Sequence, residues 1–278
     1  MPWLRLKRTW LALFLILATV AYFSIRPSNA RTWSGDQTRL ASATFEGDLV
    51  HVKDIRNFHY RSTTDYDPAW YDKTFDLREL ESLWFMVEPF DEGKGAAHTL
   101  VSFGFAGPAG PEYLVVSVEI HKEVGEEFSV VKGILRQYEL MYVVGDERDL
   151  IQLRSNYRKD DVYLYPIRVP KERIRAMLVG MLERANRLRE EPEFYNTLTN
   201  TCTTNIVRHV EEVAPGRVPR FRREVILPGY SDRLAYDLDL LDTDLPFEKA
   251  RERFRINERA LRAQGDPDFS LKIRETGT

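Results

Sequence analysis

The chain has 278 residues, of which 43% are hydrophobic, 12% aromatic and 30% charged, and its formal net charge is −3. This composition is typical of a globular protein with a substantial core, and it excludes a disordered, collagen-like or low-complexity chain. A single cysteine excludes an intrachain disulfide framework and every multi-thiolate zinc site. Because the basic residues form no dense block, we expect no nucleic-acid partner.

The first thirty residues differ from the rest of the chain. Arg5, Lys7 and Arg8 precede an uncharged apolar run over residues 10–25. This pattern predicts a membrane anchor over residues 10–26, or alternatively a cleaved signal peptide, because Ser28-Asn29-Ala30 resembles a small-x-small cleavage site. Both alternatives export the domain that follows.

The composition before and after this apolar segment divides the rest of the chain into further parts. A basic segment covers residues 1–9, and a linker covers residues 27–45. The main domain is expected over residues 46–246 and a helical tail over residues 247–278. No internal repeat or second domain boundary is visible after residue 45.

Alternation of apolar and polar residues predicts strands through the first part of the domain. The predicted strands cover residues 50–55, 84–87, 98–105, 113–122, 138–144, 148–154 and 162–169. The period then changes to 3.6, which predicts helices over residues 174–188, from about residue 202 until Pro215-Gly216, and over residues 247–263. Strands followed by helices predict an α+β domain with a mainly antiparallel sheet.

The second of these helices has a cysteine at its predicted start. Residues 195–205 read YNTLTNTCTTN, a sequence rich in the Thr and Asn residues that cap helices. Free N–H groups and the dipole at a helix start stabilise a thiolate, and those near Thr203 can bind an oxyanion. The pattern therefore favours Cys202 as a thiol nucleophile; the alternative is a small buried hydrophobic residue.

A thiol nucleophile needs a base, and His98 is the candidate. His209 lies two turns beyond Cys202 on the same helix and cannot reach it. If residues 98–119 form a hairpin centred between residues 108 and 109, partners have numbers that add to 217, so His98 faces Glu119. A carboxylate in that place orients the imidazole, although a solvated surface charge is the alternative for Glu119. A glycine-rich loop over residues 92–97 borders His98 and offers an edge for substrate.

No residue spacing indicates a metal or a cofactor. The histidines form no H-x-x-x-H or H-E-x-x-H pair, and no glycine-rich phosphate loop is present. Four aspartates between residues 237 and 244 form an acidic run, for which a solvated loop is a better interpretation than a cation site. We therefore predict no metal and no cofactor.

Five segments of the sequence carry a resemblance to a known bacterial family. They are AHTLVSFGF (97–105), YLVVSVEIHKEVGE (113–126), YELMYVVGDERDLIQLR (138–154), DVYLYPIRV (161–169) and EFYNTLTNTCTTNIVRHV (193–210). The chain resembles a family that occurs alone and as the N-terminal periplasmic domain of the lipoprotein N-acyltransferase Lnb. The resemblance implies a circularly permuted papain-like fold, with Cys202 as nucleophile and His98 as base. His121 is not expected to be essential, because most relatives have Arg or another polar residue there.

The resemblance and the residues together define an expected function. We expect a single-pass protein of the inner membrane with its domain in the periplasm, acting as a Cys–His acyltransferase or hydrolase on an ester or amide. Its substrate is expected among lipids, lipoproteins and cell-wall peptides. The acyltransferase itself has a multi-span membrane region, whereas this chain has one candidate span, so lipoprotein N-acylation is not implied specifically. The alternatives are a cell-wall peptidase or amidase with the same dyad, and a non-catalytic periplasmic binding or assembly module.

Overall fold

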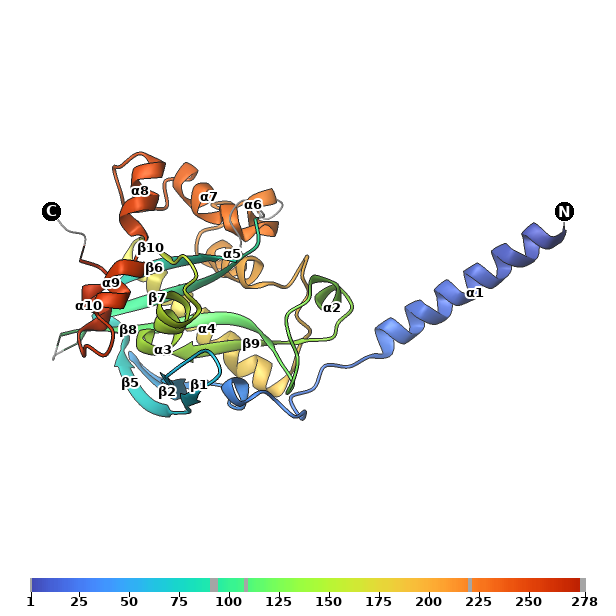
Figure 1. The fold of residues 1–278 in the computed structure, drawn as a ribbon, viewed down its shortest axis with the longest axis horizontal. Helices are drawn as coiled ribbons and strands as arrows, with labels where there is room; N and C mark the ends of the chain where they lie inside the picture. The colour runs from blue at the N-terminus through green and yellow to red at the C-terminus, as the bar shows by residue number, and fades with distance from the viewer. Residues whose placement is uncertain (1, 91–94, 108–109, 220–221, 276–278) are drawn as a thin grey trace.

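The computed structural model describes residues 2–90, 95–107, 110–219 and 222–275. Helix α1 (Pro2–Ser24) projects away from the folded domain (Figure 1). Its window Lys7–Ser24 is long and apolar enough to cross a membrane, and none of that window is buried in the domain. The predicted apolar segment is therefore a helix that stands free of the core.

A sheet of eight strands forms the centre of the described part of the chain. Its order is β1-β2-β9-β8-β7-β6-β10, and β5 pairs with β2 outside this path. The strands are β1 (Ser42–Glu46), β2 (Leu49–Arg56), β5 (Trp70–Asp76), β6 (Leu80–Pro89), β7 (Ala97–Gly107), β8 (Gly110–His121), β9 (Glu139–Gly145) and β10 (Tyr163–Pro166). A separate ribbon pairs β3 (His59–Tyr60) with β4 (Tyr66–Asp67). The pairing of β2 with β9 is parallel and the other pairs are antiparallel, so the predicted α+β class with a mainly antiparallel sheet is confirmed.

The hairpin of β7 and β8 has the predicted register. Its partners run from Leu100↔Ser117 to Gly107↔Gly110, and every pair of numbers adds to 217. The predicted turn at residues 108–109 and residues 92–94 of the glycine-rich loop lie outside the described residues. Alternation along a strand then divides β7 into two sets of side chains, which point to opposite faces of the sheet.

One face of the sheet packs against α4 (Lys171–Glu190) and α5 (Cys202–Val213), as the apolar periodicity predicts. Val101 and Phe103 of β7 share a core cluster with Met181 of α4 and Ile206 of α5. The short helices α6 (Arg223–Ile226), η4 (Pro228–Tyr230) and α7 (Ser231–Asp237) follow α5 and extend this layer. This face holds the largest part of the core.

The other face of the sheet is also covered, and here one prediction is wrong. Residues 148–154, predicted as a strand, belong to α3 (Glu147–Gln152) and to a π-helical segment, η3 (Leu153–Arg158). The Asp146 side chain caps α3 by accepting a hydrogen bond from the amide of Arg148. Apolar residues at 150, 151 and 153 fit either period over so short a run, and the cap together with burial against the sheet selects the helix.

The last two helices of the C-terminal segment complete this second layer, whereas Ala250 and Phe254 belong to the core cluster of the first face. The helix predicted over residues 247–263 is broken into α8 (Phe247–Phe254) and α9 (Asn257–Arg262), and α10 (Phe269–Lys272) follows. Ala260 and Phe269 pack in a core cluster with Leu100 of β7 and Leu150 of α3. The sheet therefore has helices on both faces (Figure 1).

Candidate functional site

Cys202 is the first residue of α5, as the capping pattern predicts. The Thr201 side chain accepts a hydrogen bond from the amide of Thr204, and the Thr204 hydroxyl accepts one from the amide of Thr201. This reciprocal cap leaves the amides of Cys202 and Thr203 at the open end of the helix. Cys202 is 6% exposed, and its Sγ lies 3.7 Å from the Thr203 hydroxyl.

The loop before α5 is stabilised by its own side chains. The Asn196 side-chain oxygen accepts hydrogen bonds from the amides of Leu198 and Thr199, and the Asn200 amide group donates to the carbonyl of Phe194. Buried Tyr195 lies within this loop, and burial together with the neighbouring Cys202 raises its pKa. The phenol is therefore protonated near neutral pH.

Thr203 connects the start of α5 to the sheet. Its hydroxyl lies 2.9 Å from the hydroxyl of Thr99 on β7, and both side chains are buried. Thr203 also lines an apolar cavity of about 340 Å³. The cavity lies between β6, β7, α4, α5 and α7, and its apolar lining includes Leu83, Phe85, Val101, Met177, Ile206, Val207, Val210, Val213, Val225, Leu234, Ala235 and Leu238. Such a cavity fits a hydrocarbon chain better than a polar peptide.

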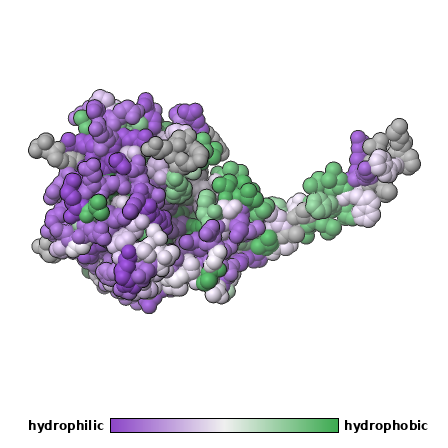
Figure 2. Space-filling model, in the orientation of Figure 1, coloured by the Kyte–Doolittle hydropathy of each residue, from purple (hydrophilic) through white to green (hydrophobic). Residues whose placement is uncertain are grey.

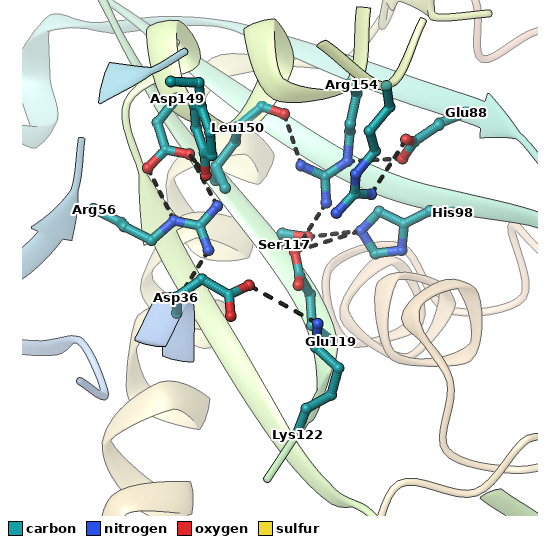
Figure 3. A network of polar contacts seen from close by, with 12 residues as sticks. Asp36, Arg56, Glu88, His98, Ser117, Glu119, Lys122, Asp149, Leu150 and Arg154 are labelled. Carbon is teal, nitrogen blue, oxygen red and sulfur yellow. Dashed lines mark hydrogen bonds and ion pairs between the residues drawn. The ribbon is translucent and has the colours of Figure 1, made fainter. Parts of the chain in front are cut away.

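His98 belongs to a different group of side chains, shown in Figure 3. Its Nε2 lies 2.7 Å from the Ser117 hydroxyl, and that hydroxyl donates to Glu119 Oε1 at 2.8 Å. Ser117 therefore accepts a hydrogen bond from Nε2–H, which places the ring proton on Nε2. His98 Nε2 also lies 3.9 Å from Glu119, so the predicted juxtaposition of these two residues on neighbouring strands is confirmed.

Arg154 connects this group to a second carboxylate. Its Nη2 donates to Glu119 at 2.9 Å and its Nε donates to Glu88 at 2.7 Å (Figure 3). The Arg158 guanidinium lies 3.6 Å from the other Glu88 oxygen. Glu88 and Arg154 were not predicted from the sequence, because a residue that is polar in a strand pattern is ordinarily assigned to a solvated face.

Burial and the two arginines set the charges in this group. Burial and the positive charge of Arg154 lower the pKa of His98 to about 3, so its imidazole is neutral near neutral pH. Burial acts to raise the pKa of Glu119, but Arg154 outweighs it and holds that pKa below the usual range. Burial raises the pKa of Glu88 to about 7 against the opposing effect of both arginines. A neutral His98 is held between an ionised carboxylate and a guanidinium.

His98 and Cys202 lie on opposite faces of the sheet. Thr99 points toward α5, where it meets Thr203, so the preceding residue in the strand points the other way. His98 accordingly contacts Ser117 on the face covered by α3 and η3, whereas Cys202 belongs to the core cluster of the α4 and α5 face. The structure thus brings Cys202 together with Thr203, and His98 together with Glu119, but it does not bring the two pairs together.

The histidine of α5, His209, has its own hydrogen-bond partners. His209 Nε2 lies 3.0 Å from the Tyr142 hydroxyl, and its Nδ1 lies 3.1 Å from Glu212. The Tyr142 hydroxyl also contacts the side chain of Asn205. These bonds hold α5 against β9, two turns from Cys202.

Arg168 pairs with three of the four aspartates of the acidic run, and Asp237 pairs with Arg233. Arg168 contacts Asp239, Asp242 and Asp244 at 3.1 to 3.5 Å. In the parts of the chain that the structure describes, no group of three His, Cys, Asp or Glu side chains has the geometry to hold a metal ion. The aspartates are therefore ion-pair partners of an arginine.

Comparison with known proteins defines the family. The profile of a family described as the Lnb N-terminal periplasmic domain matches residues 66–227, more than half of the chain. Comparison with curated proteins and with solved structures gives no match. The chain belongs to the Lnb N-terminal periplasmic domain family. The matched region contains β5 to β10, α4 and α5, and with them His98, Glu119 and Cys202.

Membership of a periplasmic-domain family and a candidate N-terminal span agree with each other. Both are consistent with a membrane-anchored periplasmic protein. The resemblance inferred from the sequence is confirmed at the level of the family, and the chemistry of the site is a separate question.

Proposed function

We propose that this protein is an inner-membrane-anchored, periplasmic thiol-dependent acyltransferase or hydrolase, with Cys202 as its nucleophile. The observation that carries the proposal is the position of Cys202 as the first residue of α5, directly before a residue that lines the apolar cavity. A helix start stabilises a thiolate and an oxyanion, and an apolar cavity next to it accommodates an acyl chain.

The proposed reaction has two halves, formation of a thioester on Cys202 and its cleavage. In each half the carbonyl carbon gains one bond and loses another. The Cys202 thiolate attacks an ester or amide carbonyl, and the amides at the start of α5 stabilise the tetrahedral oxyanion. Collapse of this intermediate breaks the carbon–oxygen or carbon–nitrogen bond, leaving a thioester on Cys202, while the leaving group takes a proton. This proton is the one that the Cys202 thiol gave up to water when the thiolate formed. Attack by water or an amine on the thioester then releases the product and the thiolate.

His98 is the part of the predicted dyad that this geometry supports least. To act as the base it would have to leave Ser117 and cross to the other face of β7. We therefore assign His98 and Glu119 a structural role in the polar group around Arg154, and test that role separately from the role of Cys202.

A second candidate function is a non-catalytic module that binds an apolar ligand. The observation that favours it is the same separation of His98 from Cys202, which leaves no imidazole in contact with the thiol among the described residues. In this case the cavity binds a hydrocarbon chain and Cys202 is a buried small residue. The apolar lining gives less support to a cell-wall peptidase or amidase.

Trapping of an acyl-enzyme distinguishes these functions. The full chain is reconstituted in phospholipid vesicles, and its intact mass is recorded with and without hydroxylamine, which cleaves thioesters. We expect a hydroxylamine-sensitive acyl adduct that Cys202→Ala abolishes and His98→Ala retains. Loss of the adduct with His98→Ala, in a protein that still folds, would restore His98 as the base.

Two variants test the cavity. Val213→Phe narrows it, whereas Val179→Phe adds the same volume on α4 at a residue that does not line it. We expect the adduct to fall at least tenfold with the first variant and to persist with the second. Absence of any adduct, combined with Cys202 labelling by iodoacetamide no faster than a free thiol, would reject catalysis. Fatty-acid binding that Val213→Phe removes would then support the binding module.

A further inference from the structure

A cluster of exposed apolar side chains lies on and around the short helix α2 (Val130–Ile134). We call it the α2 patch; its members are Val124, Phe128, Val130, Val131, Ile134, Leu135 and Leu198. Val124 is 67% exposed and Val131 is 62% exposed. Isolated apolar residues are normal on a protein surface, but this density within one segment marks an interaction site.

The patch is in direct contact with the end of the candidate membrane span. The Tyr22 hydroxyl, in the last turn of α1, donates a hydrogen bond to the carbonyl of Ile134 at 3.1 Å. The guanidinium of Arg136 lies over the rings of Tyr22 and Phe23, 4.5 and 4.8 Å from their centres. Figure 1 shows α2 on the side of the domain from which α1 projects, and Figure 2 shows hydrophobic surface where helix and domain meet.

This contact fixes the depth of the patch relative to a bilayer. Aromatic residues at the end of a membrane span, such as Tyr22 and Phe23, prefer the interface between the acyl chains and the headgroups. A segment that hydrogen-bonds to Tyr22 lies at the same level. The side chains of the α2 patch then face lipid rather than water.

The charges around α2 indicate which kind of surface the α2 patch contacts. Residues 123–136 contain three acidic and two basic side chains, so the segment has no electrostatic attraction to an anionic surface. Its affinity must come from burial of apolar side chains, which suits the interfacial region of the bilayer that holds α1. A protein partner would not explain why the patch is continuous with the end of the span.

We propose that the α2 patch is a second membrane contact, which inserts into the interface of the bilayer spanned by α1. The proposal does not depend on the function of Cys202. It has a consequence for that site, because the Thr197 hydroxyl donates to the carbonyl of Val130 and the ring of Phe128 contacts the ring of Tyr195. The patch therefore holds the loop before α5 next to the membrane surface.

Depth measurement with a fluorescent label tests this inference in the full chain. In a Cys202→Ser background, which removes the native thiol, Val131→Cys carries an environment-sensitive nitrobenzoxadiazole label. The matched control is Leu261→Cys on α9, a residue that is also apolar and 62% exposed but packs on no part of α1 or α2. Both proteins are reconstituted at low protein-to-lipid ratio in vesicles of phosphatidylcholine and phosphatidylglycerol.

We expect the label at 131 to emit at shorter wavelength and to be quenched by nitroxide lipids several-fold more than the label at 261. Val124→Cys, labelled in the same way, serves as a second patch position if Val131→Cys does not fold. Equal, water-like emission at the patch and control positions would overturn the proposal. So would shielding at 131 that is insensitive to nitroxide lipids and disappears on dilution of the protein in lipid, because that result would mean contact between two copies.

Discussion

The hydroxyl of Thr203 on α5 lies 2.9 Å from the hydroxyl of Thr99 on β7, and this contact shows which face of the sheet the helix start covers. Thr99 follows His98 directly in an extended strand, so the side chain that meets α5 is the threonine and not the histidine. The candidate nucleophile and the candidate base are thereby held on opposite sides of β7.

A double-mutant cycle tests the threonine contact. Thr99→Val or Thr203→Val leaves one buried hydroxyl without its partner, so we expect each single variant to lower the free energy of unfolding by about 1–3 kcal/mol. The double variant replaces both hydroxyls with methyl groups and should cost less than the sum of the two. Additive costs in urea denaturation would show that the two hydroxyls do not interact.

Removal of Arg154 should be strongly destabilising. Arg154→Met leaves buried Glu88 and partly buried Glu119 without their guanidinium partner, and we expect a loss of about 3–5 kcal/mol in the free energy of unfolding. Arg61→Met is the control, because Arg61 forms exposed, solvent-screened pairs with Asp65 and Asp67 and its loss should leave the free energy of unfolding nearly unchanged. Similar losses in the two variants would show that the buried ion pairs of Arg154 contribute no more to the free energy of unfolding than exposed ion pairs do.

Acid should destabilise the folded domain from about pH 6.5 downward. Burial lowers the pKa of His98 to about 3 and those of His121 and His209 to about 4, from an unfolded value of 6.5. Between these values the unfolded chain binds more protons than the folded chain, so stability is present above pH 6.5 and is lost as pH falls. Each histidine contributes a slope of at most about 1.4 kcal/mol per pH unit within its window, and Glu88, whose pKa burial raises to about 7, opposes one of them between pH 7 and pH 4.5.

Thermal unfolding between pH 7 and pH 5 measures this effect. His121→Gln should flatten the dependence of the unfolding free energy on pH, because a glutamine has no proton to bind. An unaltered slope in His121→Gln would contradict the assignment.

The C-terminal segment should be required for folding. Arg274 donates to Glu147 through both Nη atoms, at 2.7 and 2.5 Å, and its guanidinium lies 3.5 Å from the ring centre of Tyr113. Glu147 is fully buried, so Arg274→Ala should lower the free energy of unfolding by about 3–5 kcal/mol. Arg262→Ala, which removes an exposed pair with Glu258, should change it by less than about 1 kcal/mol. Equal melting temperatures for the two variants would contradict the prediction that the C-terminal segment stabilises the fold through Arg274.

Gly133 should not tolerate a side chain. A Cβ on Gly133 would lie 2.2 Å from the Thr197 hydroxyl and 3.3 Å from the ring of Tyr195, so Gly133→Ala must move the Thr197 side chain, and with it the bond to Val130, or α2 itself. Gly180→Ala is the matched control, because its Cβ meets its neighbours at 3.5 Å or more and alanine favours the helix by up to about 1 kcal/mol. Melting temperatures should fall for the first variant and rise for the second.

The sequence by itself determined the local features of this protein. The register of the β7–β8 hairpin and the start of α5 at Cys202 were both predictable, because strand alternation and helix capping depend on neighbours in the chain. The family was also recognisable from short motifs, of which the segment around Cys202 is the most specific.

Only the tertiary structure decided what covers the second face of the sheet. The pattern at residues 148–154 is too short to separate a strand from a helix, and the polar residues of β7 and β8 read as a solvated face. That face is buried under α3, η3 and α10, where Glu119 pairs with Arg154, a residue with no local signal of its own, and His98 contacts Ser117. Which side of β7 meets the helix bearing Cys202 depends on packing between elements about a hundred residues apart, and no local pattern encodes it.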